Sequence, residues 1–190
     1  MIVVFEGPSY AGKSSIREAT GALLRQRNVP VAEICHGGTL GGSLRSLMME
    51  REQVLDPIEK LLLYGARLAS NTAEVQRALS LAPTSVVLLD RYVISLVVLA
   101  HHVLGLPREL VERVSRIASR DLSVDVTVFL DISHREHALR GGKLDRAVFE
   151  KYRGGFRAER DRHEGVRMLL SFRGESVEDY AHKVLSEIGV

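Results

Sequence analysis

Residues 7–14 read Gly-Pro-Ser-Tyr-Ala-Gly-Lys-Ser, which matches the G-x-x-x-x-G-K-[ST] pattern of a phosphate-binding loop. This segment, here called the P-loop, follows an apolar run and precedes an amphipathic one. Its backbone N–H groups and the helix N-terminus can surround polyphosphate oxygens, with Lys13 at the β- and γ-phosphates and the Ser14 hydroxyl on Mg²⁺. The sequence therefore predicts a nucleoside triphosphate site. The residues expected to bind the nucleotide are Gly7, Ser9, Tyr10, Ala11, Gly12, Lys13, Ser14 and Ser15.

A second chemical signal is the pair Asp90-Arg91, which directly follows the apolar run 86–89. In P-loop enzymes an acidic residue at a strand end approaches Mg²⁺ or its waters. Ligands bind at the carboxyl ends of parallel strands, so both side chains should project towards the P-loop. We therefore expect Ser14 and Asp90 to manage the metal. The N-K-x-D and D-x-x-G patterns of a GTPase switch are absent from suitable positions.

Short apolar runs alternate with longer amphipathic ones, which is typical of βα units around a parallel sheet. Their continuous apolar character suits strands that helices cover on both faces. The expected strands are Ile2–Phe5, Pro30–Ile34, Ser85–Leu89, Val124–Leu130 and Val166–Ser171. The expected helices are Lys13–Gln26, Leu40–Glu50, Pro57–Leu81, Val93–Leu104, Arg108–Arg120, Arg135–Leu139, Arg146–His163 and Val177–Ile188. The fold class is thus α/β, a three-layer α/β/α P-loop NTPase fold with a five-stranded parallel sheet. No repeat or linker divides residues 1–190, so a single domain is expected.

Composition narrows the function classes. A net charge of +2 gives no case for a nucleic-acid-coating protein. One cysteine, Cys35, excludes an internal disulfide and a multi-cysteine zinc site. Apolar stretches such as Leu96–Ala100 are too short to span a bilayer, and the N-terminus does not resemble a signal peptide. We therefore expect a cytoplasmic protein that binds neither nucleic acid nor membrane.

Taken in order along the chain, these motifs resemble the thymidylate kinase family of P-loop nucleoside monophosphate kinases. The resemblance covers nearly the whole chain. The matching segments are Phe5-Glu6-Gly7 with the P-loop, His36-Gly37-Gly38-Thr39, residues 61–67, Asp90-Arg91-Tyr92, Val128–Asp131, Arg140, Asp145-Arg146 and Arg153-Gly154-Gly155-Phe156. The resemblance implies ATP- and Mg²⁺-dependent phosphorylation of a nucleoside monophosphate, with dTMP or a related (deoxy)nucleoside monophosphate favoured. It also implies a homodimer.

The resemblance implies site residues beyond the P-loop. Residues 134–157 would form a short arginine-rich lid, because residues 134–173 carry nine Arg and two Lys against six acids. Catalytic roles fall to Lys13, Arg91, Arg140 and Arg146. Acceptor-binding roles fall to Glu6, Arg45, Tyr64, Arg67 and Arg91. Arginine stabilises the charge on the transferred phosphoryl group, so lid arginines would lower the barrier electrostatically.

Departures from the family pattern gather on the acceptor side. Ser9 stands where the family usually has an Asp that contacts the acceptor sugar, Ile34-Cys35-His36 replaces R-E-P, and Val98-Leu99-Ala100 replaces A-Y-Q. They leave open a kinase that acts on a hydroxyl of a nucleoside or other small metabolite, with Glu6 or Asp90 as the base. A non-catalytic ATP-binding regulatory module is the third reading.

Overall fold

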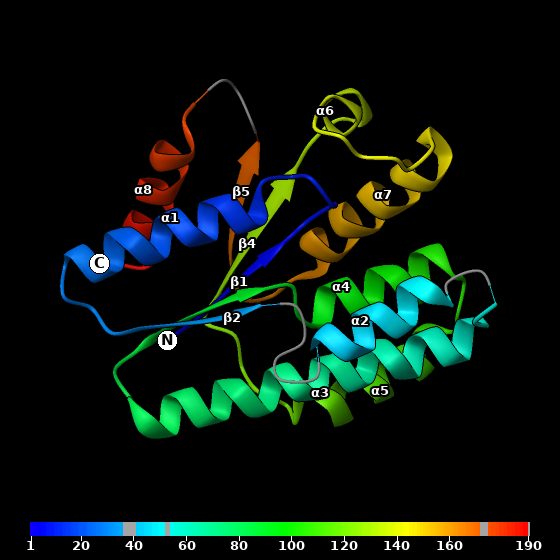
Figure 1. Cartoon of the computed structure of the whole chain (residues 1–190), viewed down its shortest axis with the longest axis horizontal. Coiled ribbons are helices and arrows are strands. Elements are labelled where there is room, and N and C mark those ends of the chain that lie inside the picture. The colour runs from blue at the N-terminus through cyan, green and yellow to red at the C-terminus, as the bar shows by residue number, and fades with distance from the viewer. Residues whose placement is uncertain (36–40, 52–53, 172–174, 190) are drawn as a thin grey trace.

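The computed structural model describes residues 1–35, 41–51, 54–171 and 175–189. Their strands form one all-parallel sheet in the order β2-β3-β1-β4-β5 (Figure 1). The strands are β1 (Ile2–Glu6), β2 (Val31–Cys35), β3 (Val86–Asp90), β4 (Val126–Asp131) and β5 (Val166–Ser171). Register places Phe5 and Cys35 on either side of Asp90, and Glu6 beside Phe129. The carboxyl ends of these strands therefore meet at one edge of the sheet.

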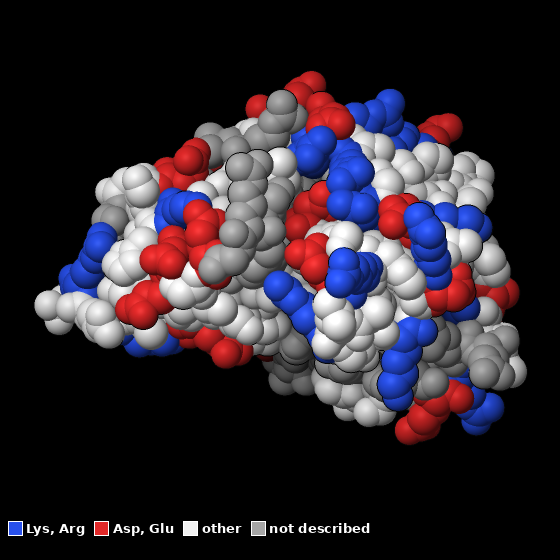
Figure 2. All heavy atoms as spheres, turned by 90° about the horizontal axis from the view of Figure 1, so that it is seen from above, with Lys and Arg blue, Asp and Glu red and all other residues white. Residues whose placement is uncertain are grey.

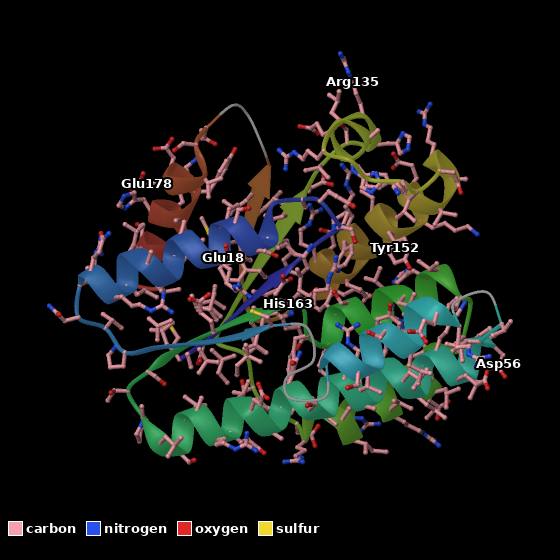
Figure 3. The ribbon with its side chains drawn as sticks, viewed as in Figure 1. Glu18, Asp56, Arg135, Tyr152, His163 and Glu178 are labelled. Carbon is pink, nitrogen blue, oxygen red and sulfur yellow. The ribbon has the colours of Figure 1, made fainter. Side chains whose placement is uncertain are left out.

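The helices are α1 (Lys13–Gln26), α2 (Gly41–Glu50), α3 (Pro57–Leu81), α4 (Val93–Val97), α5 (Arg108–Ser119), α6 (His134–Leu139), α7 (Arg146–Arg162) and α8 (Val177–Glu187). Sequence and structure agree on both bounds of α1, α3 and β5. For α3 the reason is local. Asp56 and Glu59 form a reciprocal capping box and Pro57 occupies the first helical position, so the start is encoded within four residues (Figure 3).

Helices cover both faces of the sheet. In β1, Val3 and Phe5 belong to a core formed with α1 and α8, whereas Ile2 and Val4 belong to a second core formed with α3, α4 and α5 (Figure 1). Alternation along a strand sends successive side chains to opposite faces, which explains the two cores. The predicted three-layer α/β/α architecture is confirmed. Among the described residues, no helix is long and apolar enough to cross a membrane.

The helix predicted over Val93–Leu104 is not continuous. After α4 the chain widens into a π-helical turn, η2 (Val98–Val103), where the Leu104 amide donates to the Leu99 carbonyl at 2.9 Å. In the widened turn, His102 Nε2 lies 2.5 Å from Glu159 Oε1 on α7. The π turn thus coincides with a contact to Glu159, 57 residues further along the chain. Hydrophobic periodicity cannot reveal such a contact.

Candidate active site

The P-loop connects β1 to α1 at the carboxyl edge of the sheet. Steric constraints explain why two of its positions, Gly7 and Gly12, are glycines. Gly7 has φ 143, and a Cβ there would lie 2.2 Å from the Leu130 carbonyl oxygen of β4. Gly12 has φ 90 and starts α1. No side chain of the described residues caps this helix, which leaves its first amides to an anion. Ala11 is fully buried and its amide donates to the Pro8 carbonyl at 3.3 Å, which closes the loop.

Lys13 is buried, with 6% of its surface exposed, and its Nζ donates to the Pro8 carbonyl oxygen at 2.8 Å. Burial lowers the pKa of Lys13 to about 7, and the charge of Arg91 acts in the same direction. Asp90 and Glu6 oppose the shift. The Pro8 carbonyl thus holds the Lys13 amine in place. Asp90 and Glu6 do not fully offset the effect of burial, so an additional anion, such as a bound phosphate, would stabilise the charged amine.

Because the pKa of Lys13 is about 7, we predict that nucleotide binding takes up a proton at Lys13. A bound triphosphate favours the charged amine and returns its pKa towards 10. Uptake should approach one proton at pH 8 and fall almost to zero at pH 6, where the free protein is already protonated. Calorimetric titration with ATP in two buffers of different ionisation enthalpy measures this number. Lys13→Arg is the control, since a guanidinium stays protonated throughout; equal uptake by both proteins at both pH values would contradict the prediction.

Two oxygen groups lie beside Lys13. The Ser14 hydroxyl donates to Asp90 Oδ2 at 2.7 Å, and Asp90 is 2% exposed. Within the described residues, no cluster of three or more His, Cys, Asp or Glu could hold a metal by protein ligands alone. Mg²⁺ keeps several waters and takes phosphate oxygens, with one or two oxygens from the protein. The Ser14–Asp90 pair fits that ion.

A cavity of about 380 Å³ opens over the P-loop. It is lined by Tyr10, Gly12, Lys13, Ser14, Ser15 and Arg140. Arg140 follows α6, and its Nη1 donates to the Tyr10 carbonyl oxygen at 3.2 Å.

Most of the basic side chains on the face seen from above gather on the half that carries α6 and α7 (Figure 2). By contrast, the side chain of Arg135, also on α6, points away from the body of the molecule (Figure 3).

Arg91 is held from several sides. Its backbone has φ 69, and its amide donates to the Phe5 carbonyl at 3.1 Å. One guanidinium nitrogen donates to Ser95 Oγ at 3.0 Å and the other to Ser9 Oγ at 3.3 Å. The guanidinium carbon lies 5.8 Å from the centre of the Phe156 ring on α7. These contacts fix a cation at the mouth of the P-loop and leave further N–H donors for an anion.

Glu6 is fully buried and lies beneath the start of α4. Its Oε1 accepts from the amides of Tyr92 and Ser95 at 2.8 and 3.2 Å, and its Oε2 accepts from the Ser95 hydroxyl. Burial raises the pKa of Glu6, while these hydrogen bonds and the charge of Arg91 act to lower it. Both carboxylate oxygens are therefore engaged in satisfying the α4 N-terminus.

Two of the predicted acceptor residues, Tyr64 and Arg67, lie on α3. Tyr64 and Arg67 are partly buried, and the Arg67 guanidinium carbon lies 5.4 Å from the centre of the Tyr64 ring. Arg45 belongs to α2, but its side chain falls outside the described part of the chain, as does the segment 36–40. Asn71, one turn beyond Arg67, is a residue that sequence reasoning missed. It is 6% exposed, and its Oδ1 accepts no hydrogen bond from the other residues that the structure describes.

The arginines of the basic segment 134–157 differ in what they contact. Arg153 and Arg157, four residues apart on α7, both bind Asp131 at the end of β4, each at 2.7 Å. Burial alone would raise the pKa of Asp131, but these hydrogen bonds bring it below its usual value. Arg146 is exposed at the first residue of α7 and forms no ion pair with the described residues. The structure thus brings Arg140 to the P-loop. It holds Arg153 and Arg157 on Asp131, a pairing that the i, i+4 spacing with an acidic strand end could have suggested.

Known proteins of similar sequence include thymidylate kinases. A family model described as Thymidylate kinase matches residues 5–169. The thymidylate kinase of Gloeobacter violaceus is 32% identical over 203 residues, covering 100% of this chain and 95% of that protein. That of Chlorobium chlorochromatii is 34% identical over 138 residues, or 72% of this chain, and the match spans only 62% of the Chlorobium protein.

The fold is also found in solved structures. The crystal structure of thymidylate kinase from Ehrlichia chaffeensis superposes with a TM-score of 0.79 and covers 99% of this chain and 98% of its own. Sequence identity is 18%, so this likeness concerns the fold.

Proposed function

Because this chain belongs to the thymidylate kinase family, we propose that it transfers the γ-phosphate of ATP to a nucleoside monophosphate, with dTMP as the favoured acceptor. One observation carries the proposal. Lys13 and Ser14, the pair Asp90-Arg91, and Arg140 come from three separate segments and converge on the P-loop. Binding a nucleotide without turnover does not require this set, which argues against a regulatory module.

The residues act by positioning and charge. The P-loop amides and Lys13 hold the donor phosphates, and Arg91 and Arg140 offset charge on the transferred group. Ser14 and Asp90 would hold Mg²⁺, which, when bound, neutralises phosphate charge. Residues 134–157 serve as the lid in this proposal, and Arg146 is its second arginine candidate.

The surroundings of Glu6 favour a phosphate acceptor over a hydroxyl acceptor. A hydroxyl nucleophile benefits from a general base, whereas a phosphate is already anionic and needs mainly orientation. Both oxygens of Glu6 are occupied by the start of α4, and Asp90 is paired with Ser14. Glu6 is therefore not poised to deprotonate a hydroxyl, and the Ser14–Asp90 pair is placed to hold Mg²⁺.

On the acceptor side, Tyr64, Arg67 and Asn71 share one flank of α3, since they are three and four residues apart. A buried amide oxygen without a partner costs about 1–3 kcal/mol, which a donor on the ligand would recover. Thymine and uracil carry such a donor in their ring imide. These features support a nucleoside monophosphate whose base carries a ring N–H, and the family match favours dTMP among these.

We predict that Asn71→Leu raises the KM for dTMP by up to about tenfold, the value of one neutral hydrogen bond, with little change in the KM for ATP. It should also raise the melting temperature, because it removes a buried group that the protein leaves unsatisfied. Steady-state kinetics and thermal unfolding measure both. Thr72→Val is the matched control: it removes a bond of 2.8 Å to the Tyr92 hydroxyl and should lower stability without the selective rise in KM. A normal KM for dTMP in Asn71→Leu would remove Asn71 from the acceptor site.

The proposed activity is tested by ADP release from ATP and Mg²⁺ with a panel of nucleoside monophosphates, nucleosides and no acceptor. We expect turnover with dTMP or a related pyrimidine monophosphate. Activity on a hydroxyl compound with silence on every monophosphate would replace the proposal with the hydroxyl kinase. Silence throughout, with ATP still bound, would favour the regulatory module.

We also propose a homodimer in the cytoplasm. Ile58 and Leu62 lie one turn apart on α3 and are 43% and 57% exposed, and Leu47 on α2 is 44% exposed. Exposed apolar side chains on adjacent helices are typical of a surface that another chain covers. Sedimentation equilibrium measures the oligomeric state.

A further inference from the structure

Tyr10 has a backbone conformation that does not suit its type. Its φ is 64, in the left-handed region, where the Cβ of an L-residue other than Gly comes too close to the following carbonyl oxygen. Gly or Asn would avoid much of that strain at the same place in the P-loop. Strain of this kind persists where the surrounding structure makes use of it. The contacts of Tyr10 therefore indicate its purpose.

Two residues of the segment 137–141 contact Tyr10, and the backbone of a third, Gly141, passes near its ring. The Tyr10 ring meets the His137 ring edge-on, with centroids 5.4 Å apart and planes at 89°. A Cβ on Gly141 would lie 3.9 Å from Tyr10 Cε1, so the backbone after α6 lies against the same ring. Arg140 donates to the Tyr10 carbonyl oxygen at 3.2 Å. One P-loop residue thus touches the lid through both its side chain and its backbone.

His137 provides a rigid partner for that ring. It is fully buried and packs against Phe149 of α7 at 4.7 Å and His134 at 6.1 Å between ring centres. A Cβ on Gly142 would lie 2.1 Å from the His137 ring, so the following turn closes over it. Neither ring nitrogen forms a hydrogen bond within the described residues. Packing alone therefore holds the ring, and α6 and the start of α7 form one body with Tyr10 at its edge.

We propose that Tyr10 is a positioning residue: its ring docks the lid onto the P-loop and thereby places Arg140 over the donor phosphates. Arg140 shares the lining of the 380 Å³ cavity with Lys13 and Ser14, which is where phosphate charge develops during transfer. The consequence for catalysis rests on the proposed kinase function. The docking itself rests only on the contacts of Tyr10.

The kinetic test compares three variants. Tyr10→Gly and Tyr10→Asn both tolerate the left-handed backbone and lack the ring, whereas Tyr10→Phe keeps the ring. We expect kcat to fall about 3- to 10-fold in the first two, the scale on which loss of one aromatic pair shifts the docking equilibrium, with KM for ATP changed less than about threefold. The conservative Tyr10→Phe should retain most of the wild-type kcat. A loss confined to Tyr10→Gly would assign the effect to backbone freedom and overturn the proposal.

A double-mutant cycle with Arg140→Ala separates positioning from direct contact. If Tyr10 acts through Arg140, adding Tyr10→Asn to Arg140→Ala causes no further loss of kcat. Additive losses would mean that Tyr10 acts on the nucleotide by itself, and the proposal would be wrong.

Hydrogen exchange tests the docking without activity. The amides of Arg140, Gly141 and Gly142 are hydrogen-bonded within the α6 segment and report its opening. An aromatic pair is worth about 0.5–1.5 kcal/mol, so exchange at these amides should be about fivefold faster in Tyr10→Asn than in Tyr10→Phe. Equal rates would overturn the docking. If the wild-type protein turned over no acceptor, the proposed function would fail, and the exchange rates would still decide this inference.

Discussion

Replacing Lys13 by Met is expected to lower kcat by about 10³-fold while the protein remains folded. Lys13 is 6% exposed and donates to the Pro8 carbonyl in the P-loop. Because little water reaches the amine, its interaction with the donor phosphates is only weakly screened. The site lowers its pKa to about 7, which means that the folded protein gains nothing from the charge until an anion binds. Removal of the amine should therefore leave the melting temperature equal or higher.

The measurement pairs kcat at saturating ATP with thermal unfolding. Lys183→Met is the control, because Lys183 is an exposed residue of α8 that pairs with Glu175 away from the P-loop. A Lys13→Met protein that melts as expected but keeps more than a tenth of the wild-type kcat would contradict the assigned role.

Arg91→Gly is expected to cause a comparable loss, about 10³-fold in kcat, the range seen when an arginine that stabilises phosphoryl transfer is removed. Gly suits this position because φ is 69, so the variant removes the guanidinium without straining the backbone. The lost contacts to Ser9, Ser95 and Phe156 are those that aim the cation at the P-loop. The fold should survive, since these contacts lie at the mouth of the site.

Chemical rescue makes this prediction specific. Guanidinium ion, at concentrations far below those that unfold proteins, should restore part of the kcat of Arg91→Gly and none of that of Lys13→Met. Arg120→Gly is the matched control: Arg120 also has a left-handed backbone, φ 51, but lies at the exposed end of α5 and bonds Gln76. Equal loss in Arg120→Gly would mean that backbone freedom, and not the guanidinium, explains the result.

The charge of the lid region can be interpreted more specifically than its composition allows. Nine arginines between residues 134 and 173 fit either a cationic flap over an anionic ligand or an ordinary solvated helix. In the structure Arg153 and Arg157 form ion pairs with Asp131, and Arg160 forms one with Asp161. Arg108 of α5 and His102 of η2 meet Glu159 on the same helix. Arg153, Arg157 and Glu159 therefore anchor α7 to β4, α5 and η2, and Arg140 is the arginine of this region that lies beside the P-loop.

Features encoded by residues close together in the chain were predictable from the sequence. The P-loop pattern spans eight residues, and its strand and helix follow from apolar periodicity on either side. The start of α3 follows from a capping box and a proline, and the alternation of apolar runs indicates the parallel sheet. The Asp at the end of β3 could be assigned to the P-loop edge because parallel strands share one carboxyl edge.

The partners of those residues were decided by the tertiary structure. Ser14 meets Asp90 across 76 residues, and Glu6 meets Ser95 across 89, because β3 lies beside β1 in the sheet order. The π turn at η2 accompanies a contact with Glu159, and the strained backbone of Tyr10 is matched by a ring on α6, 127 residues further along the chain. Residue types and local spacing determine which groups are present and which elements carry them. Strand order and helix packing determine which groups meet, because these long-range contacts depend on the whole fold.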